Sequence, residues 1–283
     1  WGYGRNKQFY YFKKNNIILD PFSGSGTTMV QANELGMHAI GIDISIFNTL
    51  IANCKIMKYD LSELNAQIKN ISFAISKIRN TSNIIEFENE LMKALYDFNN
   101  KYFPGPEYKY KLKQGFINEE KYGKEKEMEF LPFYNSLVKK YNIKLKQNAA
   151  KSFLDKWYSE HIRFEIDSAY QQIKKIKDED SRNLLYVILS RTIRSCRATT
   201  HADLATLIEP VTSAYYCSKH GKICKPIFSI YKWWETYSKD TIDRIMKFSH
   251  LRTNTEQICL TGDSCKMDIL KELEKKNKSL FEL

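Results

Sequence analysis

Short apolar runs near both ends of the chain predict buried strands of a parallel sheet. These runs occupy residues 17–19, 38–42 and 257–260, and the first two are followed directly by Asp20 and Asp43. They lack the alternation of a strand with one wet face, which is typical of strands covered on both sides. A helix is predicted over residues 29–35, between the first two runs, and Gly36 takes the position of a helix C-cap. The order strand, loop, helix, strand predicts an α/β fold.

The middle of the chain has apolar residues at helical spacing. This spacing predicts helices over residues 46–80, 84–98, 134–177 and 181–196. Residues 101–135 hold several prolines, glycines and tyrosines, and they predict an irregular, partly mobile segment. We therefore expect core segments at 1–54 and 256–283, separated by a mainly helical insertion at 55–255.

Charge is unevenly distributed among these three segments. The chain of 283 residues has a formal net charge of +11, and nearly all of the excess lies within residues 55–255. A basic insertion is typical of a protein that binds a phosphate backbone, which favours double-stranded DNA as a partner. The alternative is a lysine-rich solvated surface.

Composition narrows the class of protein further. The hydrophobic share is 43%, as in ordinary globular proteins, and no apolar run approaches the length of a membrane span. Six cysteines in a chain of this length do not resemble a secreted disulfide framework. A reducing, cytoplasmic location is therefore expected.

The loop between the first strand and the first helix carries the strongest functional signal. It is rich in small residues, and glycines occur where a backbone must come close to a ligand. Asp43, at the end of the second run, follows Gly24 by about 20 residues, the spacing at which such an acid reaches ribose hydroxyls. The unit therefore predicts a nucleotide-type cofactor.

Three cofactor types compete for this loop. A P-loop needs a lysine after its glycines, and no lysine occurs between Asp20 and Asp43. A dinucleotide fingerprint needs a third glycine where Met29 stands, although Gly24 and Gly26 fit. A loop for S-adenosylmethionine passes near the methionine part of the cofactor and needs no bound pyrophosphate. A dehydrogenase and a chance glycine-rich turn are the alternatives to this third interpretation.

The string LDPFSGSGTT, residues 19–28, closely resembles the cofactor loop of DNA amino-methyltransferases, which methylate exocyclic amino groups of adenine or cytosine. The resemblance implies a Rossmann-like class I methyltransferase sheet that binds S-adenosylmethionine. Loop glycines would approach the methionine part, Asp43 would hold ribose hydroxyls, and Asp263 would hold the adenine amino group. The cofactor-binding residues that it implies are Asp20, Pro21, Phe22, Ser23, Gly24, Ser25, Gly26, Thr27, Thr28, Asp43, Ile44, Asp263 and Ser264.

Parts of the insertion resemble type II restriction-system DNA methyltransferases that have a long helical insert. The resemblance is carried by residues 190–204, 209–226 and 241–253. Arg191, Arg194 and Arg197 are spaced to share one helical face, and His201 follows them. In a chain rich in lysine, three arginines favour phosphate or guanine contacts, and a solvated face is the alternative. These four residues are the expected DNA-binding residues.

The catalytic loop of the family is missing. Amino-methyltransferases use an Asp/Asn/Ser-Pro-Pro-aromatic loop, whose oxygens accept the N–H bonds of the target amine while the aromatic ring stacks on the flipped base. No Pro-Pro pair occurs in the chain, and Leu283 precedes the expected fourth strand. We assign no catalytic residue and expect no activity from this chain alone. The catalytic loop is expected on a second polypeptide or on a missing C-terminal part.

The expected function is that of an S-adenosylmethionine-dependent DNA methyltransferase, or its cofactor-binding half, in a restriction-modification system. The target is an exocyclic amine of a flipped base, with cytosine N4 favoured over adenine N6. The alternative is a non-catalytic subunit that binds cofactor or DNA and regulates or completes a partner methyltransferase.

Several metal-ligand residue types cluster late in the insertion. Cys217, His220 and Cys224 have spacing suitable for ligands, and Cys196 or His201 could supply a fourth for tetrahedral zinc. No standard Cys-x-x-Cys pair is present, however. Buried thiols with a hydrogen-bonded histidine are the favoured interpretation, and no metal is assigned.

Overall fold

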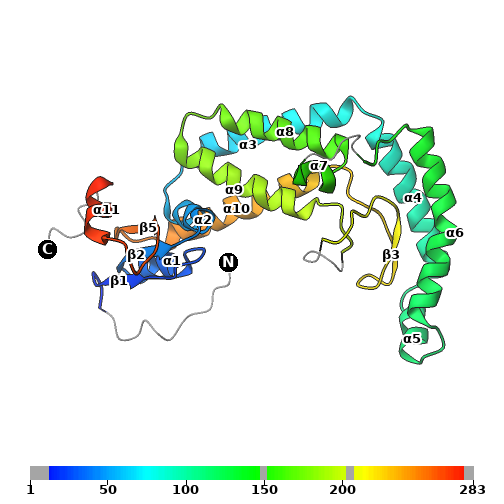
Figure 1. The fold of residues 1–283 in the computed structure, drawn as a ribbon, viewed down its shortest axis with the longest axis horizontal. Helices are drawn as coiled ribbons and strands as arrows, with labels where there is room; N and C mark the ends of the chain where they lie inside the picture. Colours follow the sequence, from blue (N-terminus) through cyan, green and yellow to red (C-terminus); the bar gives the residue numbers. More distant parts are fainter. Residues whose placement is uncertain (1–12, 147–151, 202–206, 277–283) are drawn as a thin grey trace. The chain divides into compact units, whose positions relative to one another are not determined.

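The computed structural model describes residues 13–146, 152–201 and 207–276 (Figure 1). They group into two compact units. The sheet unit comprises the chain through Gln67, Ile176–Ile188, and the chain from Ser238 onward; the helical unit comprises Ile68–Lys175 and Leu189–Tyr237. The sheet unit thus also includes part of the predicted insertion. Among the described residues, no helix is both long and apolar enough to cross a membrane.

The sheet unit is built on a small parallel sheet with the strand order β1-β2-β5. Its strands are β1 (Ile17–Asp20), β2 (His38–Asp43) and β5 (Gln257–Thr261). Asp20 pairs with Gly41 and Asp43 with Thr261, so the carboxyl ends of all three strands lie at one edge of the sheet. The structure confirms a mixed α/β chain with a small parallel sheet.

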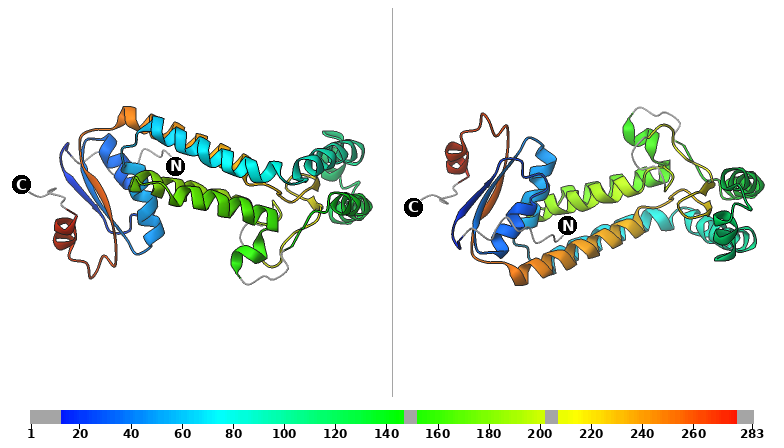
Figure 2. Two further views of the ribbon diagram at one scale, coloured as in Figure 1. Left: turned by 90° about the horizontal axis from the view of Figure 1, so that it is seen from above. Right: turned by 90° about the horizontal axis from the view of Figure 1, so that it is seen from below.

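Helices cover both faces of this sheet (Figure 2). The helices α1 (Thr27–Glu34) and α2 (Ile46–Ile56) lie on one face, and α11 (Ile269–Lys275) lies on the other. The neighbouring strand residues Ala39 and Ile40 pack into different hydrophobic clusters, because successive side chains of a strand point to opposite faces. The strands β2 and β5 are mostly buried, as predicted from the sequence, whereas β1, at an edge of the described sheet, is only partly buried.

The helical unit packs long helices against a short hairpin. Its elements, some of which extend into the sheet unit, are α3 (Leu61–Asn80), α4 (Ile84–Tyr102), α5 (Glu107–Lys113), α6 (Glu119–Lys140), α7 (Phe153–Trp157), α8 (Glu160–Lys174), α9 (Glu179–Ser195), β3 (Tyr215–Cys217), β4 (Lys222–Cys224) and α10 (Tyr231–Leu251). Phe87 of α4, Tyr134 of α6 and Phe228 belong to one buried aromatic core. The antiparallel β3–β4 hairpin packs on this core.

The prediction of an irregular segment at residues 101–135 is wrong. Helices α5 and α6 occupy most of it, and α6 contains both Gly123 and Pro132. A side chain at Gly123 would overlap the ring of Tyr216, so glycine here permits close approach of α6 to the hairpin. The buried face of α6 outweighs the helix-breaking tendency of both residues.

Candidate cofactor site and the arginines of α9

The glycine-rich loop folds over the ends of β1 and β2. The Asp20 carboxylate accepts a hydrogen bond from the Phe22 N–H at 3.1 Å, which starts the turn. The Ser23 N–H donates to the carbonyl of Ile42 at 2.9 Å, and the Ser23 hydroxyl lies 3.0 Å from the sulfur of Cys259. The loop is therefore fixed to β2 and β5 at its base.

Gly24 and Gly26 both adopt the left-handed conformation, with φ of +51° and +78°. A Cβ at Gly26 would lie 2.6 Å from the Cβ of Ala52, whereas a Cβ at Gly24 would meet nothing within 4 Å. Gly26 thus permits helix packing, while Gly24 faces open space. Of these two glycines, only Gly24 leaves room for a ligand beside the loop.

Asp43 is the last residue of β2, the middle strand of the described sheet. Its carboxylate accepts hydrogen bonds from the Gly24 N–H at 2.9 Å, the Ser45 N–H at 2.8 Å and the Asn48 side-chain amide at 3.1 Å. The Ser45 bond, together with those from Asn48 and Gly24, lowers the pKa of Asp43. Asp43 is therefore ionised at neutral pH. A carboxylate has about four acceptor positions, so it retains capacity for a ligand hydroxyl.

The loop after β5 joins the same edge. The Gly262 N–H donates to the carbonyl of Asp43 at 3.0 Å. Asp263 then accepts a bond from the Cys265 N–H at 3.0 Å, and its other oxygen lies 3.6 Å from the Lys266 ammonium. The structure thus brings the predicted cofactor loop, Asp43 with Ile44, and Asp263 with Ser264 to one edge of the sheet.

Exposed apolar side chains occur in the same segments as these polar groups. Phe22 is 81% exposed, Ile44 79% and Ile46 76%. Large apolar side chains on a surface often mark a binding site, and ligand sites combine apolar walls with a few placed polar groups. The sequence interpretation included Phe22 and Ile44 but missed Ile46.

Lys55 was also missed. This residue of α2 is only 6% exposed, and its ammonium donates to the Ser25 hydroxyl of the cofactor loop at 3.1 Å. Burial, assisted by the charge of Arg244, lowers the pKa of Lys55 to about 8. Nothing in its local sequence distinguishes Lys55 from the many other lysines.

The predicted DNA-binding arginines lie in the helical unit. Because α9 ends at Ser195, only Arg191 and Arg194 belong to it, and both are exposed. Arg197 lies beyond the helix and donates to the Arg194 carbonyl at 3.2 Å. The Arg191 guanidinium lies 4.0 Å from the ring centre of Tyr237. The expectation of one helical face for all three arginines is therefore wrong for Arg197.

His201, the fourth residue of the expected DNA-binding set, lies beside Cys217, His220 and Cys224. Cys196, the other residue considered as a fourth ligand, is buried and does not belong to this group.

Comparison with known proteins identifies the class. The DNA methylase family matches residues 10–53, which include β1, the glycine-rich loop, α1 and β2. This match and the relative described next support the DNA amino-methyltransferase family that the loop motif predicted.

Curated relatives extend the similarity beyond the loop. The chain is 43% identical over 281 residues to the type II methyltransferase M.MjaII of Methanocaldococcus jannaschii, a match that covers 96% of this chain and 52% of that protein. It is 45% identical over 60 residues to the type II methyltransferase M.BsoBI of Geobacillus stearothermophilus, covering 20% of this chain and 12% of that protein. The chain thus spans about half the length of M.MjaII. No solved structure matches it significantly.

Proposed function

We propose that the sheet unit binds S-adenosylmethionine and is the cofactor-binding part of a DNA methyltransferase of a restriction-modification system. One observation carries this proposal. The ionised Asp43, the open space beside Gly24 and the loop that follows β5 lie at the carboxyl edge of a parallel sheet. Ligands of open α/β sheets bind at this edge. A Rossmann-like sheet of the class I methyltransferases is the fold we propose for the whole core.

The residues at this edge fit the cofactor chemically. Asp43 offers acceptor capacity for ribose hydroxyls, and Asp263 offers a carboxylate for the adenine amino group. Phe22 and Ile44 supply apolar surface for a flat base. The backbone at Gly24 can approach the methionine part because no side chain intervenes. When bound, S-adenosylmethionine supplies an electrophilic methyl group.

We propose that the catalytic loop, which binds the target amine, lies outside these 283 residues. No Pro-Pro pair is present in the sequence. Within the described residues β1 pairs only with β2, yet Leu19 in the middle of β1 is 50% exposed. A parallel strand with an exposed apolar residue and an unpaired edge is suited to pairing with a further strand. We propose that β1 receives the strand that carries the catalytic loop, from a second polypeptide or another part of a longer chain.

The helical unit is proposed to bind the DNA. The exposed Arg191 and Arg194, with Arg197 just beyond, provide planar donors suited to phosphate or guanine. The target would be an exocyclic amine of a flipped base, with cytosine N4 favoured over adenine N6. The alternative is a non-catalytic subunit that binds cofactor or DNA. In that case the same residues bind these ligands, but no methyl group is transferred.

Methyl transfer separates these alternatives. Labelled methyl transfer to DNA is measured with this chain, with a polypeptide bearing the family's Pro-Pro loop, and with both together. We expect transfer only from the combination, and nucleoside analysis of the product distinguishes N4-methylcytosine from N6-methyladenine. Transfer by this chain alone would contradict the proposed division of labour. Cofactor binding without transfer from the combination would favour the non-catalytic subunit.

A further inference from the structure

A compact hairpin brings two cysteines and a histidine together in the helical unit. In the β3–β4 pairing, Tyr215 lies opposite Cys224 and Cys217 opposite Lys222. Gly221, at φ of +60°, donates its N–H to the Cys217 carbonyl at 2.7 Å, which closes the turn. His220 lies within this turn next to Cys217, and Cys224, two residues farther from the turn than Lys222, brings its sulfur to 3.4 Å from the Nδ1 of His220.

His201 reaches the same place from an earlier part of the chain. Its N–H donates to the Tyr215 hydroxyl at 3.0 Å, and its ring Nδ1 lies 3.0 Å from the same oxygen. Its ring centre is 4.6 Å from that of His220. With Nδ1–H donated to the hydroxyl, Nε2 is the nitrogen left for a ligand. Histidines that bind metals commonly have such an outer hydrogen bond.

The distances match a tetrahedral metal site. The potential ligand atoms of His201, Cys217, His220 and Cys224 all lie within 4.8 Å of one another. Tetrahedral zinc, with bonds of about 2.0–2.3 Å, places its ligand atoms roughly 3.3–3.8 Å apart. His220 Nδ1 and Cys224 Sγ are already 3.4 Å apart. We propose that these four residues form a structural zinc site.

The donor set favours zinc and a structural role. Two thiolates and two imidazoles are a common zinc ligand set, and the thiolates balance the charge of the ion. Four protein ligands leave no position for water or substrate, as expected of a structural site. The proposal thus assigns His201 to the metal instead of to DNA, and it replaces the interpretation of two buried thiols.

The surroundings hold the hairpin in place before metal binds. The Asn99 side chain forms two hydrogen bonds with the backbone of Ile223, each of 3.0 Å. On the other strand, the Tyr216 N–H donates to the Glu127 carboxylate at 2.8 Å. Because both strands are fixed to helices, bringing four ligands onto an ion requires only local movement.

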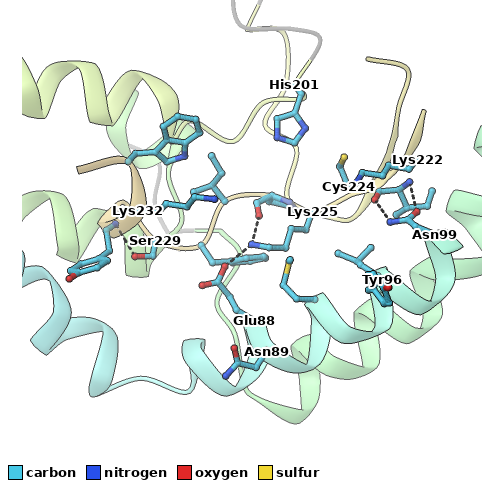
Figure 3. Close-up of a pocket in the computed structure, with 18 of the residues that line it drawn as sticks. Glu88, Asn89, Tyr96, Asn99, His201, Lys222, Cys224, Lys225, Ser229 and Lys232 are labelled. Atoms are coloured by element: carbon cyan, nitrogen blue, oxygen red, sulfur yellow. Dashed lines mark hydrogen bonds and ion pairs between the residues drawn. The ribbon is translucent and has the colours of Figure 1, made fainter. Parts of the chain in front are cut away.

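An entry path is also present. His201 and Cys224 line a cavity of about 720 Å³ (Figure 3). His220 is exposed, whereas Cys217 and Cys224 are buried. A metal can therefore reach the site from solvent and afterwards be shielded by the hairpin. The bound ion would tie the segment that follows α9, which includes Arg197, to the hairpin.

Metal content and coordination test this proposal. The whole chain is purified without a histidine tag, under reducing conditions and without chelators, and zinc is measured by elemental analysis. We expect about one zinc per chain in the wild type. After exchange with cobalt, we expect the visible spectrum of a tetrahedral ion with thiolate ligands. Cys217→Ser and Cys224→Ser should lose both signals.

Two further variants keep the test informative if loss of a buried thiol prevents folding. Cys265→Ser removes an exposed cysteine of the sheet unit and should retain the zinc. His220→Gln changes an exposed ligand, so the chain should fold but release zinc to a competing chelator at least about tenfold more readily. A folded wild type without zinc or tetrahedral cobalt, a Cys217–Cys224 disulfide in native protein, or equal zinc retention in His220→Gln would overturn the proposal.

Discussion

At the scale of single residues, the two glycines of the cofactor loop lack side chains for different reasons. Gly26→Ala combines an unfavourable φ with contact against Ala52, and we expect it to lower the free energy of unfolding by about 2–4 kcal/mol. Gly24→Ala has only the backbone strain, about 1–2 kcal/mol. Its methyl group would occupy ligand space, so cofactor affinity should fall more than stability. Urea unfolding measures the loss of stability in each variant, and titration with the cofactor measures the loss of affinity. Equal losses of stability in Gly24→Ala and Gly26→Ala would contradict the different roles of the two glycines.

The buried Lys55 predicts a pH dependence of stability. Its pKa is lowered from an ordinary value of 10.5 to about 8 in the folded chain. Between these values the unfolded chain holds a proton that the folded chain has lost. The contribution of Lys55 to stability therefore rises with pH across this window, by up to about 3 kcal/mol, and is level above it.

The variant Lys55→Met isolates this contribution. The free energy of unfolding of the wild type and of Lys55→Met is measured in urea from pH 7.5 to 10.5. As the pH rises, the wild type should gain stability relative to Lys55→Met, because methionine has no proton to lose. Other titrating groups act equally on both proteins. Parallel stability curves would show that Lys55 has an ordinary pKa.

At the scale of elements, the basic end of α9 predicts salt-dependent DNA binding. Replacement of Arg191, Arg194 and Arg197 by alanine should weaken duplex binding and reduce the slope of log affinity against log salt by up to about 3, if each arginine neutralises one phosphate. Fluorescence anisotropy over a series of salt concentrations measures both quantities.

A matched control removes the same charge elsewhere. Lys113, Lys121 and Lys124 are exposed on or near α5 and α6. Their triple alanine variant should retain nearly the wild-type slope. Equal losses in the two triple variants would indicate that α9 contributes only general positive charge.

Some secondary-structure elements could be predicted from the sequence, and others could not. The strands of the sheet and α1 were predicted because short connections and continuous apolar runs are local signals. Gly123 and Pro132 misled the prediction at α6. The position of Gly123 depends on Tyr216, which is distant in sequence, whereas Pro132 lies on the exposed side of a helix that is held by its buried face. Contacts between residues distant in sequence could not be predicted either. Examples are the hydrogen bond from Lys55 to Ser25 and the position of His201, rather than Cys196, beside the hairpin.

At the scale of the whole molecule, the proposed function gives the sheet unit the cofactor half of a reaction site and gives the helical unit the binding of DNA. The matched part of M.MjaII is about half of that protein. Among the described residues one edge of β1 has no partner strand, and this edge and the exposed Leu19 offer a physical place for further structure. The proposed function separates donor and acceptor sites in this way because, among the described residues, the proposed cofactor edge is formed by β1, β2, β5 and their loops.

Calorimetric titration with S-adenosylmethionine, and with its demethylated product, tests the central claim most directly. The folded wild type should bind both and give no heat with NADH. Asp43→Asn should bind at least about tenfold more weakly, because a charged acceptor is lost. Asp60→Asn, which changes an exposed aspartate that bonds to backbone N–H groups, should bind like the wild type. Absence of binding by the folded wild type, or equal affinity in Asp43→Asn, would contradict the account.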